Sequence, residues 1–151
     1  MQNKTKIKIF IGVVAAIIIV IIANYFLSEV IALNGNKIDH VYVRDVLVKA
    51  EVVKTETRIE KGLGGRASLA DGRGMLFEML ESEPQHFWMK GMLFPIDIIW
   101  IENERVIGCE KNISPSDQRI FTSPSDAGYV LEVPAGFCDQ YSVKINDAVK
   151  I

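Results

Sequence analysis

The sequence predicts a β-rich α+β domain, built as a small rolled antiparallel sheet or barrel with two short helices and preceded by one transmembrane helix. Three observations support this. The only long apolar run lies in the first 30 residues. Many short segments rich in Val and Ile follow, separated by clusters of Gly, Pro, Asn and Asp. Only two segments carry the start and stop signals of a helix. A chain of 151 residues has room for one domain of ordinary size.

The apolar run covers residues 9–28, which contain no charged side chain. Twenty residues at about 1.5 Å each span roughly 30 Å, the thickness of the hydrocarbon layer of a membrane. Tyr25 and Phe26 stand near one end, where aromatic rings favour the membrane interface. We therefore expect a transmembrane helix at 9–28.

The basic stub at residues 1–8 carries Lys4, Lys6 and Lys8. The positive-inside rule places this stub in the cytoplasm. The segment at 9–28 would then cross the cell membrane once, and the C-terminal domain would lie outside it. A linker at 29–40 then leads to the folded domain at 41–151. A cleaved signal peptide is the alternative, although the apolar run is longer than the usual core of such peptides.

Net charge, Cys and His content and the absence of known motifs exclude several classes of protein. Residues 29–151 contain 14 basic and 19 acidic residues, a net charge of −5, so nucleic acid is not an expected partner. Two Cys and two His are too few for a zinc knuckle or an iron–sulfur site. Phosphate-binding, dinucleotide-binding and zinc-protease motifs are absent from the sequence. We therefore expect no metal and no cofactor.

The folded part begins with a Val-rich strand pair at 41–53, interrupted near Arg44 and Asp45. Thr55 resembles a helix N-cap and Gly62 a helix stop, which predicts a helix at 56–62. Further strands are expected at 75–77, 87–89, 96–101, 105–109, 129–133, 143–145 and 149–151.

Residues 102–104 form the predicted hairpin turn between two of these strands. Residues 112–128, rich in Ser, Thr and Pro, read as a long irregular loop. Pro134 would start a second short helix that runs through 135–141.

Several motifs in this part stand in the order and spacing of the DUF192 (UPF0127) family, which the chain resembles over about residues 41–151. They are Gly62-Leu63, Gly74-Met75-Leu76-Phe77, Phe87-Trp88-Met89-Lys90, Pro95-Ile96-Asp97-Ile98-Ile99, Tyr129-Val130-Leu131-Glu132-Val133-Pro134-Ala135-Gly136 and Asp147. The resemblance implies a compact β-rich domain, often behind a signal peptide or anchor. It implies no reaction, because the biochemical function of the family is not established.

The chain departs from the family pattern at several positions. Gly91-Met92 stand where Asn-Thr is common, and Gly64 stands where Met usually follows the Gly-Leu pair. Near the C-terminus, Asn146 replaces a Gly in a Gly-Asp pair, and Ser142 stands where a Gly is common.

Three charged residues lie within the most apolar predicted strands, namely Lys90, Asp97 and Glu132. Solitary charges are costly to bury, so we expect Lys90 to lie near one of the carboxylates, beside a concavity roofed by Trp88. Such a pair either fixes the strand register or forms the polar floor of a ligand pocket. Met75 and Phe77 belong either to the lining of that pocket or to the core. His86 is interpreted as a surface residue.

Cys109 and Cys138 are the only cysteines. A disulfide between them is permitted outside the cytoplasm. The alternative, which we favour on sequence alone, is that both are small buried apolar residues.

These observations favour a membrane-anchored extracytoplasmic domain that binds a small ligand or an envelope protein partner. An envelope hydrolase that uses Asp97 or Glu132 with Lys90 is the alternative, and a structural module of a membrane complex is a third hypothesis. A pocket that holds both carboxylates would favour the hydrolase. A pocket of aromatic residues with Lys90 would favour binding, and an exposed apolar patch would favour the partner role.

Overall fold

The computed structural model describes residues 13–22 and 36–151, and the chain divides into two compact units, Met1–Gly35 and Asn36–Ile151. Residues 13–22 form a helix. The predicted stub at 1–8, both ends of the predicted membrane segment at 9–28, and most of the linker at 29–40 lie outside the described residues. Within the described part of the chain, no helix combines the length and the apolar character needed to cross a membrane.

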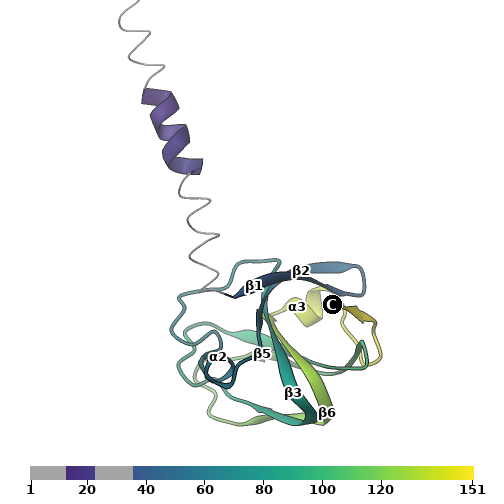
Figure 1. Cartoon of the computed structure of the whole chain (residues 1–151). Helices are drawn as coiled ribbons and strands as arrows, with labels where there is room; N and C mark the ends of the chain where they lie inside the picture. The colour runs from purple at the N-terminus through teal and green to yellow at the C-terminus, as the bar shows by residue number, and fades with distance from the viewer. Residues whose placement is uncertain (1–12, 23–35) are drawn as a thin grey trace, which may run out of the picture. The chain divides into compact units, whose positions relative to one another are not determined.

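The second unit is a β-rich α+β fold in which seven strands form one curled, half-barrel sheet (Figure 1). The strand order is β5-β4-β6-β3-β2-β1-β7. The strands are β1 (Lys37–Val43), β2 (Val46–Val53), β3 (Arg73–Phe87), β4 (Ile96–Glu102), β5 (Arg105–Ile113), β6 (Phe121–Pro134) and β7 (Val149–Lys150). The sheet is mixed rather than antiparallel as predicted, because β2 and β3 run parallel. The crossover between them, which contains α2 (Glu56–Lys61), makes this parallel pairing possible.

The two predicted hairpins are confirmed. β1 and β2 pair in antiparallel register around the turn at Arg44 and Asp45, and Arg44 has a positive φ of 57°. β4 and β5 are joined at Asn103 and Glu104, whose φ values of 48° and 57° match a type I′ turn. β1 begins at Lys37, so the last residues of the predicted linker belong to the sheet.

Two sequence predictions around β3 and β6 are wrong. The short strand expected at 75–77 is part of a 15-residue strand, β3, which ends at Phe87, so only the first residue of the strand expected at 87–89 is strand. The long loop expected at 112–128 ends early, because β6 starts at Phe121 and runs for 14 residues. β3 and β6 pair along their length as two long neighbouring ribbons, with register shifts that accommodate the polar and proline-containing stretches (Figure 1).

The helices are short, as predicted. α2 follows Thr55 and ends before Gly62, whose φ is 47°. α3 (Phe137–Gln140) is a single turn after Gly136, shorter than the predicted 135–141, and Pro134 ends β6 instead of starting the helix. Residues 143–145 form no strand.

The sheet is covered on both faces, which we name after the helix packed on each. On the α3 face lie Leu76, Ile99 and Leu131 together with Phe137 and Cys138 of α3. The α2 face buries alternate residues of the same strands and packs against α2 and the loops around it. Its main residues are Met75, Phe77, Ile98, Trp100 and Val130, with Ile59 of α2 against them.

The outer strands of the sheet meet at one end of the half-barrel. Arg105 of β5 forms an isolated bridge with Ala148, next to β7. Backbone hydrogen bonds from Val106 N–H to Asp147 O (2.9 Å) and from Val149 N–H to Glu104 O (2.8 Å) extend this contact. The curl therefore satisfies backbone groups that an open sheet edge would expose.

Candidate functional site

A cavity of about 400 Å³ lies on the α2 face, between α2 with its following loop and the ends of β3 and β6. Residues of α2 and its loop line one side, namely Glu56, Ile59, Glu60, Lys61, Gly62, Leu63 and Gly64. The sheet and the segment after β3 contribute Phe77, His86, Phe87, Trp88, Lys90, Met92 and Glu132. The cavity therefore combines an aromatic lining, a charged rim and one buried carboxyl group.

Local backbone geometry shapes the loop side of the cavity. The last N–H of the α2 turn, that of Gly62, donates to Arg58 O at 2.9 Å, and the positive φ of Gly62 then redirects the chain. Gly65 N–H donates to Gly91 O at 2.8 Å, which joins this loop to the segment that carries Trp88 and Lys90. A Cβ at Gly64 would lie 2.9 Å from Lys61 O, so the turn requires glycine at this position.

Glu132 of β6 is the buried carboxyl group of the cavity. Its side chain is 5% exposed, and its Oε2 has no hydrogen-bond partner. Burial raises the pKa of this carboxyl to about 8, although the positive charge of Arg66 acts in the opposite direction. At neutral pH the group is therefore mostly uncharged, so it can both donate and accept a hydrogen bond.

The neighbouring arginine is engaged elsewhere. Arg66 donates to both carboxylate oxygens of the buried Glu51 on β2, with Nη2 to Oε2 at 2.8 Å. Asn36 Nδ2 also donates to Glu51, at 3.2 Å. Because Arg66 and Glu51 neutralise each other, Glu132 gains little compensation for its own burial.

The predicted site residues divide between the two faces of the sheet. Trp88, Lys90, Phe77 and Glu132 line the cavity together. Met75 is buried in the core of the same face, in register with Glu132, but it is not part of the lining. The expected ion pair is not found, since among the ion pairs of the described residues none joins Lys90 to a carboxylate.

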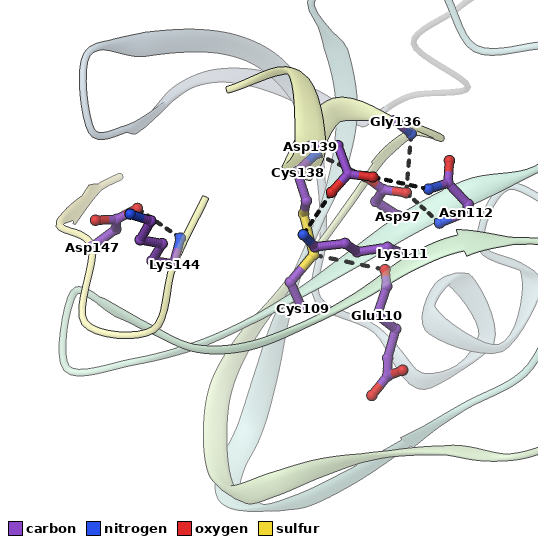
Figure 2. Close-up of polar contacts among 10 residues, drawn as sticks. All are labelled: Asp97, Cys109, Glu110, Lys111, Asn112, Gly136, Cys138, Asp139, Lys144 and Asp147. Carbon is purple, nitrogen blue, oxygen red and sulfur yellow. Dashed lines mark hydrogen bonds and ion pairs between the residues drawn. A yellow bond between two sulfur atoms is a disulfide. The ribbon is translucent and has the colours of Figure 1, made fainter. Parts of the chain in front are cut away.

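Asp97 lies on the α3 face and does not line the cavity. It is fully buried, and its carboxylate accepts three backbone N–H groups (Figure 2). Asn112 and Gly136 donate to Oδ1 at 2.7 and 3.2 Å, and Cys138 donates to Oδ2 at 2.8 Å. These bonds attach β5 and the start of α3 to β4, so Asp97 organises the fold.

Cys109 and Cys138 form a disulfide beside Asp97 (Figure 2). The interpretation of the two cysteines as unpaired apolar residues is therefore wrong. Their spacing of 29 positions in the sequence concealed the contact, because α3 folds back over β5. Asp97 and the two sulfurs lie within 4.8 Å of one another, but disulfide sulfurs are not thiolate ligands and the carboxylate already binds backbone N–H groups.

Sequence reasoning missed much of the cavity. His86, interpreted as a surface residue, is exposed and also lines the cavity, with its Nδ1 3.0 Å from Thr122 Oγ1. Phe87 packs edge-on against Phe77 at 4.9 Å between ring centroids. Met92 and the α2 loop were not recognised as lining residues. The Gly-Leu pair at Gly62 and Leu63 and the glycine that follows them were the available signals for this loop.

Comparison with known structures supports the fold. A crystal structure of a protein of unknown function from Novosphingobium aromaticivorans is 27% identical, with a TM-score of 0.75, over 79% of this chain and 89% of that one. A structure from Sinorhizobium meliloti, described as that of a proposed transcription regulator, is 26% identical, with a TM-score of 0.72, over 76% and 94%. No curated protein matches the chain.

The family model DUF192, described as Uncharacterized ACR, COG1430, matches residues 40–151. This range covers nearly all of the β-rich unit, including α2, α3 and all the strands from β2 to β7. The chain belongs to the DUF192 family.

Proposed function

We propose that this chain is a membrane-tethered extracytoplasmic module that binds a small molecule in the cavity on the α2 face. One observation carries the binding function. Glu132 is buried in the lining of the cavity, and its Oε2 has no hydrogen-bond partner. An unsatisfied buried polar atom is costly, and a ligand with a matching group would remove that cost. The volume of about 400 Å³ lies within the range of small-molecule pockets.

Hydrolysis has weaker support than binding. An uncharged carboxyl at neutral pH is suited to general acid catalysis, which favours a role for Glu132 in this alternative. That hypothesis uses Asp97 or Glu132 with Lys90, and a pocket with both carboxylates would favour it. The oxygens of Asp97, however, accept backbone N–H groups on the opposite face. Retaining and inverting glycosidases need two carboxyl groups on the same substrate, about 5–10 Å apart.

A membrane location is supported by the sequence and by the disulfide. The charge-free run at 9–28 is long enough to span a bilayer, and Lys4, Lys6 and Lys8 precede it. Disulfides persist in oxidising compartments outside the cytoplasm, and the domain contains one. We therefore propose a single-pass anchor with its N-terminus in the cytoplasm and the domain outside.

The location is tested by adding protease to intact spheroplasts. Digestion of residues 40–151 before lysis, with the N-terminus protected, is the expected result. Digestion only after lysis contradicts the orientation. A mature chain that starts near residue 33 would replace the anchor with a cleaved signal peptide.

Binding is tested by thermal unfolding of the full chain against a library of sugars, amines, carboxylic acids and nucleosides. A ligand at 100 times its Kd should add about 2.7 kcal/mol to the free energy of unfolding. The shift should disappear in Glu132→Leu, which removes the carboxyl group. It should persist in Glu81→Gln, which changes an exposed carboxylate outside the cavity. Hits whose shift survives Glu132→Leu, or no hits at all, would count against the cavity as a binding site.

A further inference from the structure

We infer that the ligand of this cavity is a neutral, hydroxyl-bearing ring, such as one monosaccharide unit, with a hydroxyl hydrogen-bonded to Glu132 and an apolar face stacked on the aromatic residues. This inference rests on the proposed binding function and specifies its ligand class. Three features of the cavity support it, namely the balance of charge at the rim, the buried carboxyl group and the aromatic lining.

The charges that line the cavity cancel. Glu56 and Glu60 contribute two negative charges, and Lys61 and Lys90 contribute two positive charges. A site for an anion would show an excess of cations, and a site for a cation would show an excess of carboxylates. The balanced rim therefore favours a ligand without net charge.

The buried group has the hydrogen-bonding capacity that a hydroxyl needs. Glu132 is mostly protonated at neutral pH, because burial raises its pKa to about 8. A protonated carboxyl has one O–H donor and a carbonyl acceptor, and a hydroxyl likewise both donates and accepts. An organic cation would instead require the ionised carboxylate, which this environment disfavours.

The aromatic residues offer apolar surface at two depths. Trp88 lines the cavity and is 45% exposed, so a ligand at the mouth of the cavity can reach it. Phe77, Phe87 and Met92 are buried residues of the lining, so they make the deeper wall of the cavity apolar. Sugar rings carry C–H groups on one face and hydroxyls around their edge. Such a ring therefore matches a cavity that is aromatic on its walls and polar at one point.

The test is a titration of the full chain in lipid nanodiscs, which avoids glycoside detergents. Its sugar probes are glucose, galactose, mannose, N-acetylglucosamine and the β-1,4-linked disaccharides of glucose and N-acetylglucosamine. Choline and benzoate are the cationic and anionic comparisons. Calorimetry gives the affinities, and saturation-transfer NMR gives the sugar protons in contact with aromatic rings. We expect at least one sugar to bind with a Kd below about 10 mM, at least tenfold more tightly than choline or benzoate.

Two variants at the same position separate the ligand classes. Glu132→Gln keeps a neutral donor and acceptor, so it should retain sugar affinity within about fivefold, whereas Glu132→Leu should weaken it more than tenfold. A cation that needs the carboxylate would lose affinity in both variants. Trp88→Ala should also weaken sugar binding. Leu93→Ala, which changes an exposed apolar residue outside the cavity lining, should leave it unchanged.

The possible failures are distinct. If no sugar binds, but choline or benzoate binds with an affinity that depends on Glu132, the sugar inference is wrong and the binding function stands. If sugars bind equally well to Glu132→Leu, the inference about this cavity is also wrong. If none of these probes and no library compound binds in a way that depends on Glu132, the proposed function fails as well.

Discussion

Asp97 and Glu132 are two buried carboxyl groups on neighbouring strands, and their surroundings differ completely. In the pairing of β4 with β6, Asp97 is opposite Val133 and Ile98 is opposite Glu132, so the two acidic residues are one position apart in register. Because side chains alternate along a strand, they lie on opposite faces of the sheet. Asp97 accepts three backbone N–H groups on the α3 face. Glu132 has an oxygen without a partner on the α2 face.

The difference shows that burial alone does not determine what a carboxyl group does. The segment around α3 and the end of β5 directs its backbone N–H groups at Asp97, and those donors stabilise the charge. On the other face, the segments around Glu132 leave a cavity, and Arg66, whose charge acts on Glu132, is paired with Glu51. The first arrangement holds the fold together, and the second leaves an unmet hydrogen-bonding requirement that a ligand can satisfy.

The largest expected effect is that of Asp97→Ala. This substitution leaves three N–H groups without their acceptor, and each unsatisfied group costs about 1–3 kcal/mol. We therefore expect the free energy of unfolding, measured by urea denaturation, to fall by about 3–9 kcal/mol. Asp126→Ala, at an exposed position of β6, is the control and should change stability by less than about 0.5 kcal/mol. Similar losses in the two variants would refute the structural role of Asp97.

Loss of the disulfide on the same face should have the next largest effect. A cross-link between residues 29 positions apart stabilises by about 3–4 kcal/mol in the loop-entropy model. The double variant Cys109→Ser/Cys138→Ser should be less stable by that amount in urea denaturation. A reducing agent should destabilise the native chain and leave the double variant unchanged. Two free thiols detected by mass spectrometry in the oxidised native chain would contradict the pairing.

Glu132, on the α2 face, should make the free energy of unfolding depend on pH. Its pKa rises from 4.5 to about 8 on folding, so between these values the folded state holds a proton that the unfolded chain releases. The contribution of this proton to the free energy of unfolding is complete below about pH 4.5 and is lost as the pH rises through 8. The free energy of unfolding should fall by about 1.4 kcal/mol per pH unit at most in this window. Urea titrations at pH 6 and pH 7 measure the slope, and Glu132→Gln should remove this contribution. An identical slope in Glu132→Gln would exclude Glu132 as its source.

The smallest effect is expected from Glu132→Gln at pH 5. At that pH the native carboxyl is protonated, and the amide has nearly the same shape and no charge. We expect a change of less than about 1 kcal/mol in the free energy of unfolding. At pH 8 and above the variant should be more stable than the native chain. A large loss at pH 5 would mean that Glu132 has a structural role comparable to that of Asp97.

Local signals predicted several elements of the fold correctly. The hairpin turns at Arg44 and Asp45 and at Asn103 and Glu104 were visible as polar interruptions of apolar strands. The extent of α2 followed from Thr55 and Gly62. These features depend on residues within a few positions of each other, so the sequence contains the information directly. The extension of β3 past Glu78 and of β6 before Tyr129 was not predictable in this way. The part of β3 after Glu78 and the part of β6 before Tyr129 are polar, and they form strands because they pair with each other, not because of their own composition.

The sequence by itself determined that a charge-free segment precedes a β-rich domain of the DUF192 type, and that Lys90, Asp97 and Glu132 have apolar neighbours along the chain. Tertiary structure alone decided which of these charged residues share a cavity. Alternation along a strand shows which residues of that strand share a face of the sheet. Whether Asp97 and Glu132, on two different strands, lie on the same face depends on the register between β4 and β6. The disulfide and the α2 wall of the cavity likewise join segments distant in sequence, and only the packing of the whole sheet brings such segments together.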